Sequence, residues 1–298
     1  MNELQQVIAM LRALPQGLNI GERRARVDAT SERYPVAADV RVEPVSARGV
    51  SAEWTSTPAA GEGDVILYLH GGGYVLGSLK SHRHFASELG RQAGMKTLAL
   101  DYRLAPEFPY PCALEDAVDG YRFLLETGYD PRRITVVGDS AGGGLSMALL
   151  LRLREQGLPQ PAGALLFSPW VDMTATADSY RHNAERDPII SREGIEFLAA
   201  QYLGPLPRQL PLASPVFADL AGIAPLTIFV GDAETLLDDS LALARVAEQA
   251  GVPVHLEVWP EMLHVWPSFY PELAQGRQAL ARAGQLLREA RLSPPPDV

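Results

Sequence analysis

A five-residue turn at 138–142, Gly-Asp-Ser-Ala-Gly, constrains the fold of this chain more than any other feature. A β-branched run at 134–137 precedes the turn, and an apolar stretch of helical character follows at 145–153. So sharp a change from strand to helix crowds its neighbours, and glycine at both ends of the turn avoids the collisions that larger side chains would make. The turn directs the Ser140 hydroxyl out of the sheet edge, beside the backbone N–H groups that begin the helix. The pattern therefore predicts a serine held where developing negative charge is stabilised.

The composition indicates one α/β domain with an appendage. The chain has 298 residues, of which 47% are hydrophobic and 21% charged, enough to bury a large core. Its net charge of −10 offers no basic excess for nucleic acid or for stable association with an anionic membrane surface. The single cysteine, Cys112, cannot form an internal disulfide, and residues 1–14 lack the basic, apolar and small-residue parts of a secretory signal. We therefore expect a cytoplasmic protein.

Strand-like and helix-like patterns alternate along most of the chain. The run at 65–69 is apolar throughout, which suits a strand buried on both faces. Such alternation indicates a mostly parallel sheet with helices on both faces, and ligands bind such sheets at the carboxyl ends of the strands. We expect strands at 39–45, 50–55, 65–69, 97–100, 133–137, 163–167, 226–230 and 254–259. We expect helices at 82–93, 112–126, 143–156, 239–250 and 272–290.

The alternation lapses for more than fifty residues after Pro169, and an interruption of this length is typical of a lid or cap. A helical pattern at 192–202 lies inside the interruption. The first twenty residues carry a single apolar stripe at helical spacing, which must pack on something. We therefore expect a cap made of two pieces, residues 1–38 and an insertion at about 175–222, over a catalytic domain that spans 39–298.

Three further features carry no chemistry in our interpretation. Residues 22–33 are rich in arginine, but acidic residues are interleaved, which favours a solvated face over a binding patch. The Ser-Pro-Pro-Pro sequence at 293–296 is typical of a tail. Cys112 opens a helical pattern with no evident base nearby, so we expect a structural residue rather than a reactive thiol.

A second glycine cluster, His-Gly-Gly-Gly-Tyr at 70–74, follows the strand at 65–69. Three successive glycines let the backbone approach a ligand closely and turn its N–H groups inward. This predicts an oxyanion hole, completed by the N–H of Ala141. The alternatives are a flexible surface loop or a phosphate-binding turn, but the Gly-x-Gly-x-x-Gly spacing of the latter is absent.

A nucleophilic serine needs a base, and His264 is the histidine best placed to serve. It follows the last predicted strand, in a loop at the same end of the sheet as Ser140. His70 is better suited to bracing its own loop through a backbone hydrogen bond. The remaining histidines lie on a predicted helix (His82 and His84), in the insertion (His182) and within a strand (His255).

The acid that orients the histidine should follow the strand at 226–230, and the loop there offers four carboxylates. Asp239 is placed to cap the next helix, and Asp238 to stabilise the N-terminus of that helix. Asp232 and Glu234 therefore remain as candidates.

The chain resembles the bacterial branch of the hormone-sensitive-lipase-like esterases, a family within the α/β-hydrolase fold. The resemblance runs from about residue 65 to residue 267, and five motifs in one order make a chance match negligible. They are His-Gly-Gly-Gly at 70–73, Tyr-Arg-Leu-Ala-Pro-Glu at 102–107 with Pro109 and Pro111, Gly-Asp-Ser-Ala-Gly-Gly at 138–143, Ser-Pro-Trp-x-Asp at 168–172 and Asp-Pro at 187–188.

The resemblance implies an α/β-hydrolase fold, with an eight-stranded, mostly parallel sheet and a cap of N-terminal and inserted helices. It implies Ser140 as nucleophile and His264 as base, with an oxyanion hole formed by the N–H groups of Gly72, Gly73 and Ala141. It further implies hydrolysis of short-to-medium acyl esters through an acyl-enzyme, a small-molecule substrate, no cofactor or metal, and a homodimer as the assembly.

The chain departs from the family's motifs at two positions. Where the family usually has aspartate in the acid loop, this chain has Glu234, so we expect Glu234 rather than Asp232 to orient His264. Glutamate is one methylene longer, and a small shift of the loop can absorb the extra length. The second departure is Leu263, where the family commonly has glycine, and it alters the surroundings of the base.

The substrate pocket is the least constrained part of the sequence. Candidates for its wall are Tyr74, Trp170, Phe197 and Tyr202, although such residues more often belong to an ordinary core. Lactone, amide or carbamate hydrolysis on the same residues remains an open alternative. A non-catalytic ligand receptor of the same fold is another, but it would be expected to have lost a member of the catalytic set, which is complete here.

Overall fold

Eight strands form one sheet in the order β1-β2-β4-β3-β5-β6-β7-β8 in the computed structural model, which describes residues 1–15 and 17–292. β1 pairs with β2, and β2 with β4, in antiparallel fashion, while every other neighbouring pair is parallel. The predicted eight-stranded, mostly parallel sheet is thus confirmed. The strands are β1 (Arg41–Ala47), β2 (Val50–Ser56), β3 (Val65–Leu69), β4 (Lys96–Leu100), β5 (Ile134–Asp139), β6 (Gly163–Phe167), β7 (Leu226–Gly231) and β8 (Val254–Trp259).

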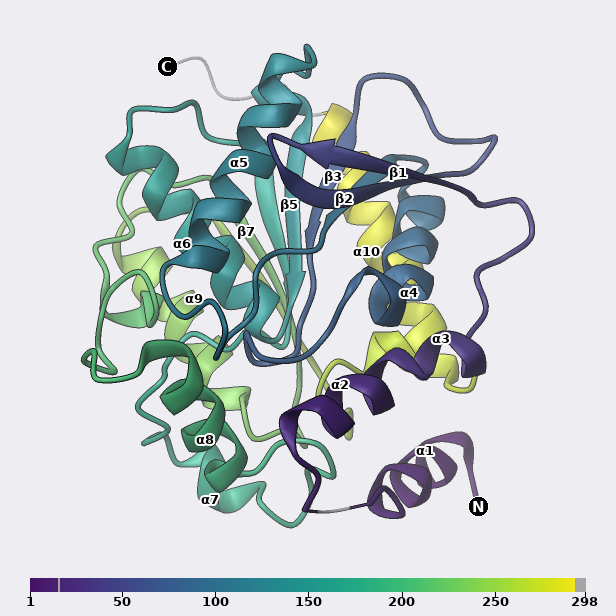
Figure 1. Cartoon of the computed structure of the whole chain (residues 1–298), viewed down its shortest axis with the longest axis vertical. Coiled ribbons are helices and arrows are strands. Elements are labelled where there is room, and N and C mark those ends of the chain that lie inside the picture. Colours follow the sequence, from purple (N-terminus) through teal and green to yellow (C-terminus); the bar gives the residue numbers. More distant parts are fainter. Residues whose placement is uncertain (16, 293–298) are drawn as a thin grey trace.

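Helices cover both faces of the sheet (Figure 1). The central strand β3 is completely buried between them, as its unbroken apolar run predicts. One face carries α4 (Leu79–Ala93) and α10 (Ala274–Leu292), and the other carries α5 (Cys112–Glu126), α6 (Ala141–Glu155) and α9 (Leu237–Gln249). Short 3₁₀ helices lie at Pro131–Arg133, Pro215–Phe217 and Trp266–Phe269.

Three helices begin earlier than the sequence predicts. α4 begins at Leu79 instead of residue 82, because the Ser78 hydroxyl accepts a hydrogen bond from the N–H of Ser81 and caps the helix. α6 begins at Ala141, directly after Ser140, so no residue separates the turn from the helix. α9 begins at Leu237, ahead of the expected residue 239.

The N-terminal helices and the insertion lie at the same end of the molecule, the bottom of Figure 1. The Arg12 guanidinium donates to the carbonyl oxygen of Glu185 at 2.9 Å, and Arg23 lies over the Phe197 ring at 5.6 Å. These contacts join segments more than 170 residues apart in the chain. The N-terminal helices are α1 (Glu3–Arg12), α2 (Ile20–Asp28) and α3 (Thr30–Arg33), and the inserted helices are α7 (Ser179–His182) and α8 (Arg192–Leu203).

Arg24 of α2 corrects the expectation that residues 22–33 form a solvated face. Its guanidinium donates to the carbonyl oxygens of Val75 at 2.8 Å and Ala105 at 2.9 Å, and it forms a two-pronged ion pair with Glu107. Arginine provides enough fixed donors to satisfy all three partners at once. The side chain therefore fastens α2 to the loops that follow β3 and β4.

No helix in the described part of the chain is long and apolar enough to cross a membrane. The tail expected at 293–296 lies outside the described residues.

We expect Arg24→Lys to destabilise the fold although the positive charge is kept. A lysine ammonium group cannot bind Glu107 and both carbonyl oxygens at once as the planar guanidinium does. The loss of the two carbonyl contacts should lower the free energy of unfolding by about 1–2 kcal/mol. Urea unfolding followed by circular dichroism measures this change. Arg23→Lys is the matched control, because the Arg23 guanidinium contacts the Phe197 ring and has no hydrogen bond or ion pair among the described residues. It should change stability by less than about 0.5 kcal/mol. Equal effects of the two substitutions would contradict the anchoring role.

Candidate active site

Ser140 lies between the last residue of β5 and the first residue of α6. Its φ of 53° and ψ of −122° are rare for a residue other than glycine, and such backbones cost about 1–3 kcal/mol. The turn also needs glycine at 142, because a Cβ there would collide with the carbonyl oxygen of Leu69 in β3. The side chain of Ser140 is mostly buried, with 8% of the residue exposed. The sheet edge and the helix start thus fix the hydroxyl in place.

The glycine loop follows β3 beside this turn. Asp139 Oδ1 accepts the N–H of Gly71 at 3.1 Å and so joins the loop to the residue before Ser140. Gly72 has a φ of 115°, which favours glycine, and its carbonyl accepts hydrogen bonds at the next turn of the loop. Among the described residues, none accepts a hydrogen bond from the N–H groups of Gly72, Gly73 or Ala141. These three donors are therefore available to a ligand.

His70 braces the glycine loop, as the sequence predicts for it. Its Nδ1 lies 2.7 Å from the carbonyl oxygen of Gly71, and its own carbonyl accepts the Tyr102 hydroxyl at 2.6 Å. The imidazole stacks on the Tyr102 ring, with centroids 4.2 Å apart. Burial lowers the pKa of His70 to about 3, so the ring is neutral at physiological pH. A neutral, stacked ring serves as a structural support.

His264 and Glu234 form a buried pair. His264 Nδ1 lies 2.6 Å from Glu234 Oε2, and the two residues are 4% and 0% exposed. The other carboxylate oxygen, Oε1, accepts the N–H of Gly231 at 2.8 Å and the hydroxyl of Ser168 at 2.9 Å. Both oxygens of the carboxylate are therefore satisfied, and Nε2 of the imidazole is the nitrogen left for other chemistry.

The pKa values of both His264 and Glu234 are raised. Burial alone would lower the pKa of His264, but the hydrogen bond and the charge of Glu234 outweigh burial and hold that pKa above its ordinary value. Burial raises the pKa of Glu234 by more than its hydrogen bond to His264 lowers it. Two groups coupled this closely titrate as a unit.

Asp232 lies apart from this pair. Its Oδ1 accepts the N–H of Glu261 at 2.8 Å and lies 3.1 Å from the guanidinium of Arg186. These contacts brace two loops, which is the role expected of a carboxylate in this turn. The structure thus brings Glu234, and not Asp232, to His264.

The expected capping role of Asp239 is wrong. α9 begins two residues before it, and the Asp239 carboxylate instead accepts the N–H groups of Val171 and Asp172 at 3.2 and 3.0 Å. Asp238 does lie in the first turn of α9, and its Oδ2 accepts the N–H of Ser179 at 2.8 Å. Tertiary contacts with the insertion therefore decide where these carboxylates point.

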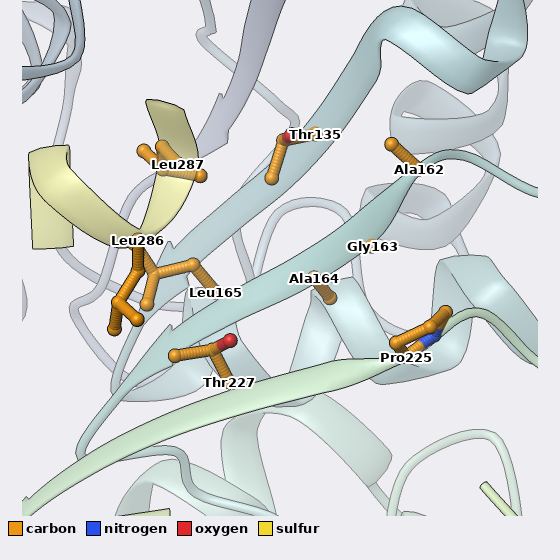
Figure 2. Close-up of a pocket in the computed structure, with 9 residues that line it drawn as sticks. All are labelled: Thr135, Ala162, Gly163, Ala164, Leu165, Pro225, Thr227, Leu286 and Leu287. Carbon is orange, nitrogen blue, oxygen red and sulfur yellow. The ribbon is translucent and has the colours of Figure 1, made fainter. Parts of the chain in front are cut away.

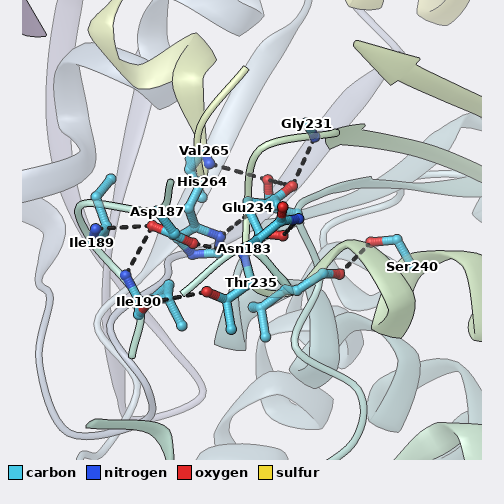
Figure 3. Close-up of polar contacts among 12 residues, drawn as sticks. Asn183, Asp187, Ile189, Ile190, Gly231, Glu234, Thr235, Ser240, His264 and Val265 are labelled. Atoms are coloured by element: carbon cyan, nitrogen blue, oxygen red, sulfur yellow. Dashed lines mark hydrogen bonds and ion pairs between the residues drawn. The ribbon is translucent and has the colours of Figure 1, made fainter. Parts of the chain in front are cut away.

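The insertion holds the acid loop in place (Figure 3). Asn183 Nδ2 donates to the carbonyl oxygens of Asp232 and Glu234 at 3.0 and 2.8 Å. Asp187 Oδ2 accepts the N–H of Thr235 at 2.8 Å. The sequence analysis quoted Asp187 only within a motif and missed Asn183, because no local pattern announces a partner about fifty residues away.

Three of the four expected pocket-wall residues belong to the core. Tyr74 and Tyr202 stack with centroids 3.9 Å apart and planes 4° from parallel, and Trp170 lies 6.0 Å from Tyr74. All three are buried, which favours the packing alternative that the sequence left open. Phe197 differs, because it is 41% exposed on α8 beneath Arg23.

A small cavity lies at the end of the parallel strands opposite to Ser140, and Figure 2 shows the residues that line it. It measures about 90 Å³ and is lined by the amino-terminal ends of β5, β6 and β7, with Leu286 and Leu287 of α10. Ligands of parallel α/β sheets bind at the other edge, so we do not assign this cavity to a substrate. In the described part of the chain, no group of three or more His, Cys, Asp or Glu side chains could hold a metal ion.

The chain is similar along most of its length to known hydrolases. Residues 66–268 match the family model described as the α/β-hydrolase fold. An acetyl-hydrolase of Streptomyces hygroscopicus is 45% identical over 268 residues, which cover 90% of this chain and 89% of that protein. An esterase of Acinetobacter venetianus is 36% identical over 270 residues, with 90% and 89% covered.

Solved structures agree with this assignment. The crystal structure of an esterase from the bacterial hormone-sensitive lipase family superposes with a TM-score of 0.94 at 48% identity, covering 97% of this chain and 98% of that one. An esterase/lipase from an uncultured bacterium gives a TM-score of 0.94 at 45% identity, covering 98% and 99%. The chain therefore belongs to the α/β-hydrolase fold family, and the resemblance to bacterial hormone-sensitive-lipase-like esterases is confirmed.

The His264–Glu234 pair predicts a shift in titration when the carboxylate is removed. In Glu234→Gln the compensation for burial is lost, so the pKa of His264 should fall below its value in the unaltered protein. Nitrogen-15 NMR of the histidine side chains as a function of pH measures it directly. In Asp232→Asn, the matched control, the pKa of His264 should stay unchanged. A fall in the Asp232 variant with none in the Glu234 variant would contradict the pairing.

Proposed function

We propose that this protein hydrolyses carboxylic esters through an acyl-enzyme on Ser140, with His264 as the base and Glu234 as the acid that orients it. The activity itself, hydrolysis of esters, follows from the family and from relatives named acetyl-hydrolase and esterase that match nine-tenths of the chain. The observation that carries the assignment of residues is the buried 2.6 Å contact between His264 and Glu234. It lies on the loops after β7 and β8, at the carboxyl ends of the parallel strands, where Ser140 follows β5.

In the first half of the reaction, Ser140 Oγ attacks the acyl carbonyl carbon as its proton passes to His264 Nε2. The N–H groups of Gly72, Gly73 and Ala141 receive the oxyanion, and this role is supported because no acceptor among the described residues binds them. The tetrahedral intermediate collapses when His264 returns the proton to the leaving alcohol oxygen and the bond from that oxygen to the acyl carbon breaks. The acyl group then remains on Ser140.

In the second half, water attacks the acyl carbon and gives a proton to His264. The same three N–H groups hold the second oxyanion, and Ser140 leaves with the proton from His264, which releases the carboxylic acid. Glu234 stays ionised throughout, because it only accepts the Nδ1–H bond and stabilises the imidazolium. No step requires a cofactor.

The N-terminal segment 1–38 and the insertion at about 175–222 form the cap in this proposal, over a catalytic domain that spans 39–298. The contacts between these two segments at one end of the molecule support this assignment. The hydrogen bonds from Asn183 of the insertion to the loop that carries Glu234 support it as well. We place the substrates among small esters with short-to-medium acyl groups. The half-buried Cys112, the single cysteine of the sequence, suits a cytoplasmic enzyme. The net charge of −10 disfavours nucleic acid as a partner. A homodimer is the assembly that we propose from the family resemblance.

Ser140→Ala should lower kcat for p-nitrophenyl butyrate by a factor of ~10⁴ or more, because the covalent route is lost. The matched control is Ser87→Ala in α4, another buried serine, whose hydroxyl donates to the carbonyl of His84 in its own helix and to no other group that the structure describes. It should keep near-normal turnover. An aryl phosphonate should label Ser140, as peptide mass spectrometry would show. A folded Ser140→Ala protein that keeps its turnover would remove the mechanism.

A further inference from the structure

Ser168 directly follows β6 and is completely buried. No step of the proposed reaction uses its hydroxyl. Its backbone has a φ of 49°, a conformation that a residue other than glycine keeps only when its surroundings hold it there. The Oγ donates to Glu234 Oε1 at 2.9 Å and accepts the N–H of Val265, the residue after His264, at 3.0 Å. One hydroxyl therefore joins the loop after β7, which carries Glu234, to the loop after β8, which carries His264.

The backbone around Ser168 reaches the nucleophile as well. The carbonyl oxygen of Phe167, the preceding residue, accepts the N–H of Ser140 at 2.8 Å, and the N–H of Ser168 donates to Phe229 of β7 at 2.7 Å. Ser168 is thus one residue or one hydrogen bond away from each of the three loops that carry Ser140, Glu234 and His264. No other side chain donates a hydrogen bond to Glu234 Oε1 among the described residues.

Glutamate makes this contact important. It has one more rotatable bond than aspartate, so its carboxylate has more orientations to lose before it can accept the bond from His264. The Ser168 hydroxyl and the Gly231 N–H both bind Oε1, which leaves Oε2 directed at the imidazole. A fixed carboxylate keeps the imidazole in one tautomer and one ring plane, which proton transfer requires.

We propose that Ser168 is a positioning residue, which aligns the Glu234 carboxylate and the His264 loop for proton transfer. The proposal rests on the function assigned above and deepens it. It also gives a role to the serine of the Ser-Pro-Trp-x-Asp motif, which the sequence analysis left without one.

The test compares Ser168→Gly with Ser168→Ala in the full-length enzyme. Both remove the hydroxyl, but glycine adopts the positive φ without strain, whereas alanine keeps the Cβ and with it the backbone strain that serine already carries, so the glycine variant should be the less strained of the two. We expect both to lower kcat by roughly 10–100-fold with KM for p-nitrophenyl butyrate within about twofold. Catalytic loss that follows the melting temperature, with full kcat in the better-folded variant, would overturn the proposal.

Ser214→Ala is the matched control. Ser214 is also completely buried, accepts the N–H of Met173 at 2.9 Å and donates to the carbonyl of Arg208 at 2.6 Å, so its removal costs similar hydrogen bonds away from the acid and the base. It should keep wild-type kcat.

The acidic limb of the kcat/KM profile should move to higher pH in the Ser168 variants only, because a carboxylate with one donor fewer binds the pair's proton more tightly. An unmoved limb would count against Ser168.

A second readout separates this inference from the function on which it rests. The Nδ1 proton of His264 resonates at low field when it bonds Glu234, and Ser168→Gly should shift or broaden that signal whether or not Ser140 is the nucleophile. If Ser140→Ala keeps its turnover, the proposed function fails while the NMR signal still decides on Ser168. If Ser140→Ala is inactive and Ser168→Gly matches the unaltered enzyme in kcat, pH profile and NMR signal, only the role of Ser168 is refuted.

Discussion

The hydrogen bond between His264 and Glu234 joins two ionisable side chains that almost no water reaches. An isolated charge in such a place costs several kcal/mol, so the carboxylate is tolerable only because each of its oxygens has a partner. Oε2 accepts from the imidazole, and Oε1 from Gly231 and Ser168. Removing one partner leaves the other group uncompensated. The proposed chemistry and the local stability therefore depend on the same few contacts.

The sheet order explains how distant residues meet. β5, β6, β7 and β8 are consecutive neighbours in the sheet and run parallel, so their following loops emerge at one edge. Those loops carry Ser140, Ser168, Glu234 and His264 in that order. The insertion adds Asn183 and Asp187, which fix the backbone of the acid loop from outside the sheet. The scaffold thus supplies the positions, and loop-to-loop hydrogen bonds supply the final orientation.

Periodicity and turn chemistry made much of this predictable from the sequence. The apolar run of β3, the crowded turn at Ser140 and the position of His264 after the last strand are all local signals. The choice of Glu234 over Asp232 needed more, since both follow β7 within three residues, and only the family's motif separated them. The structure separates them by contact, because Asp232 bonds Glu261 and Arg186.

The remaining features could not be predicted because they depend on partners far away in the chain. The sequence near Arg24 does not indicate that its guanidinium donates to the carbonyl oxygens of residues 75 and 105. The sequence near Asp239 does not indicate that its carboxylate accepts the N–H groups of residues 171 and 172 instead of capping its own helix. The burial of Tyr74 against Tyr202 likewise arises only when α8 packs on the glycine loop region. Tertiary packing decides each of these cases.

The most direct test of the account is the comparison of kcat for Glu234→Gln and Asp232→Asn, measured with p-nitrophenyl butyrate on folded proteins. The account predicts that Glu234→Gln lowers kcat by roughly 10²–10⁴, since a neutral amide can present the wrong group to the imidazole. Asp232→Asn should lose stability and keep near-normal kcat, because its contacts only brace loops. A silent but well-folded Asp232→Asn beside a nearly normal Glu234→Gln would contradict the assignment of the catalytic acid.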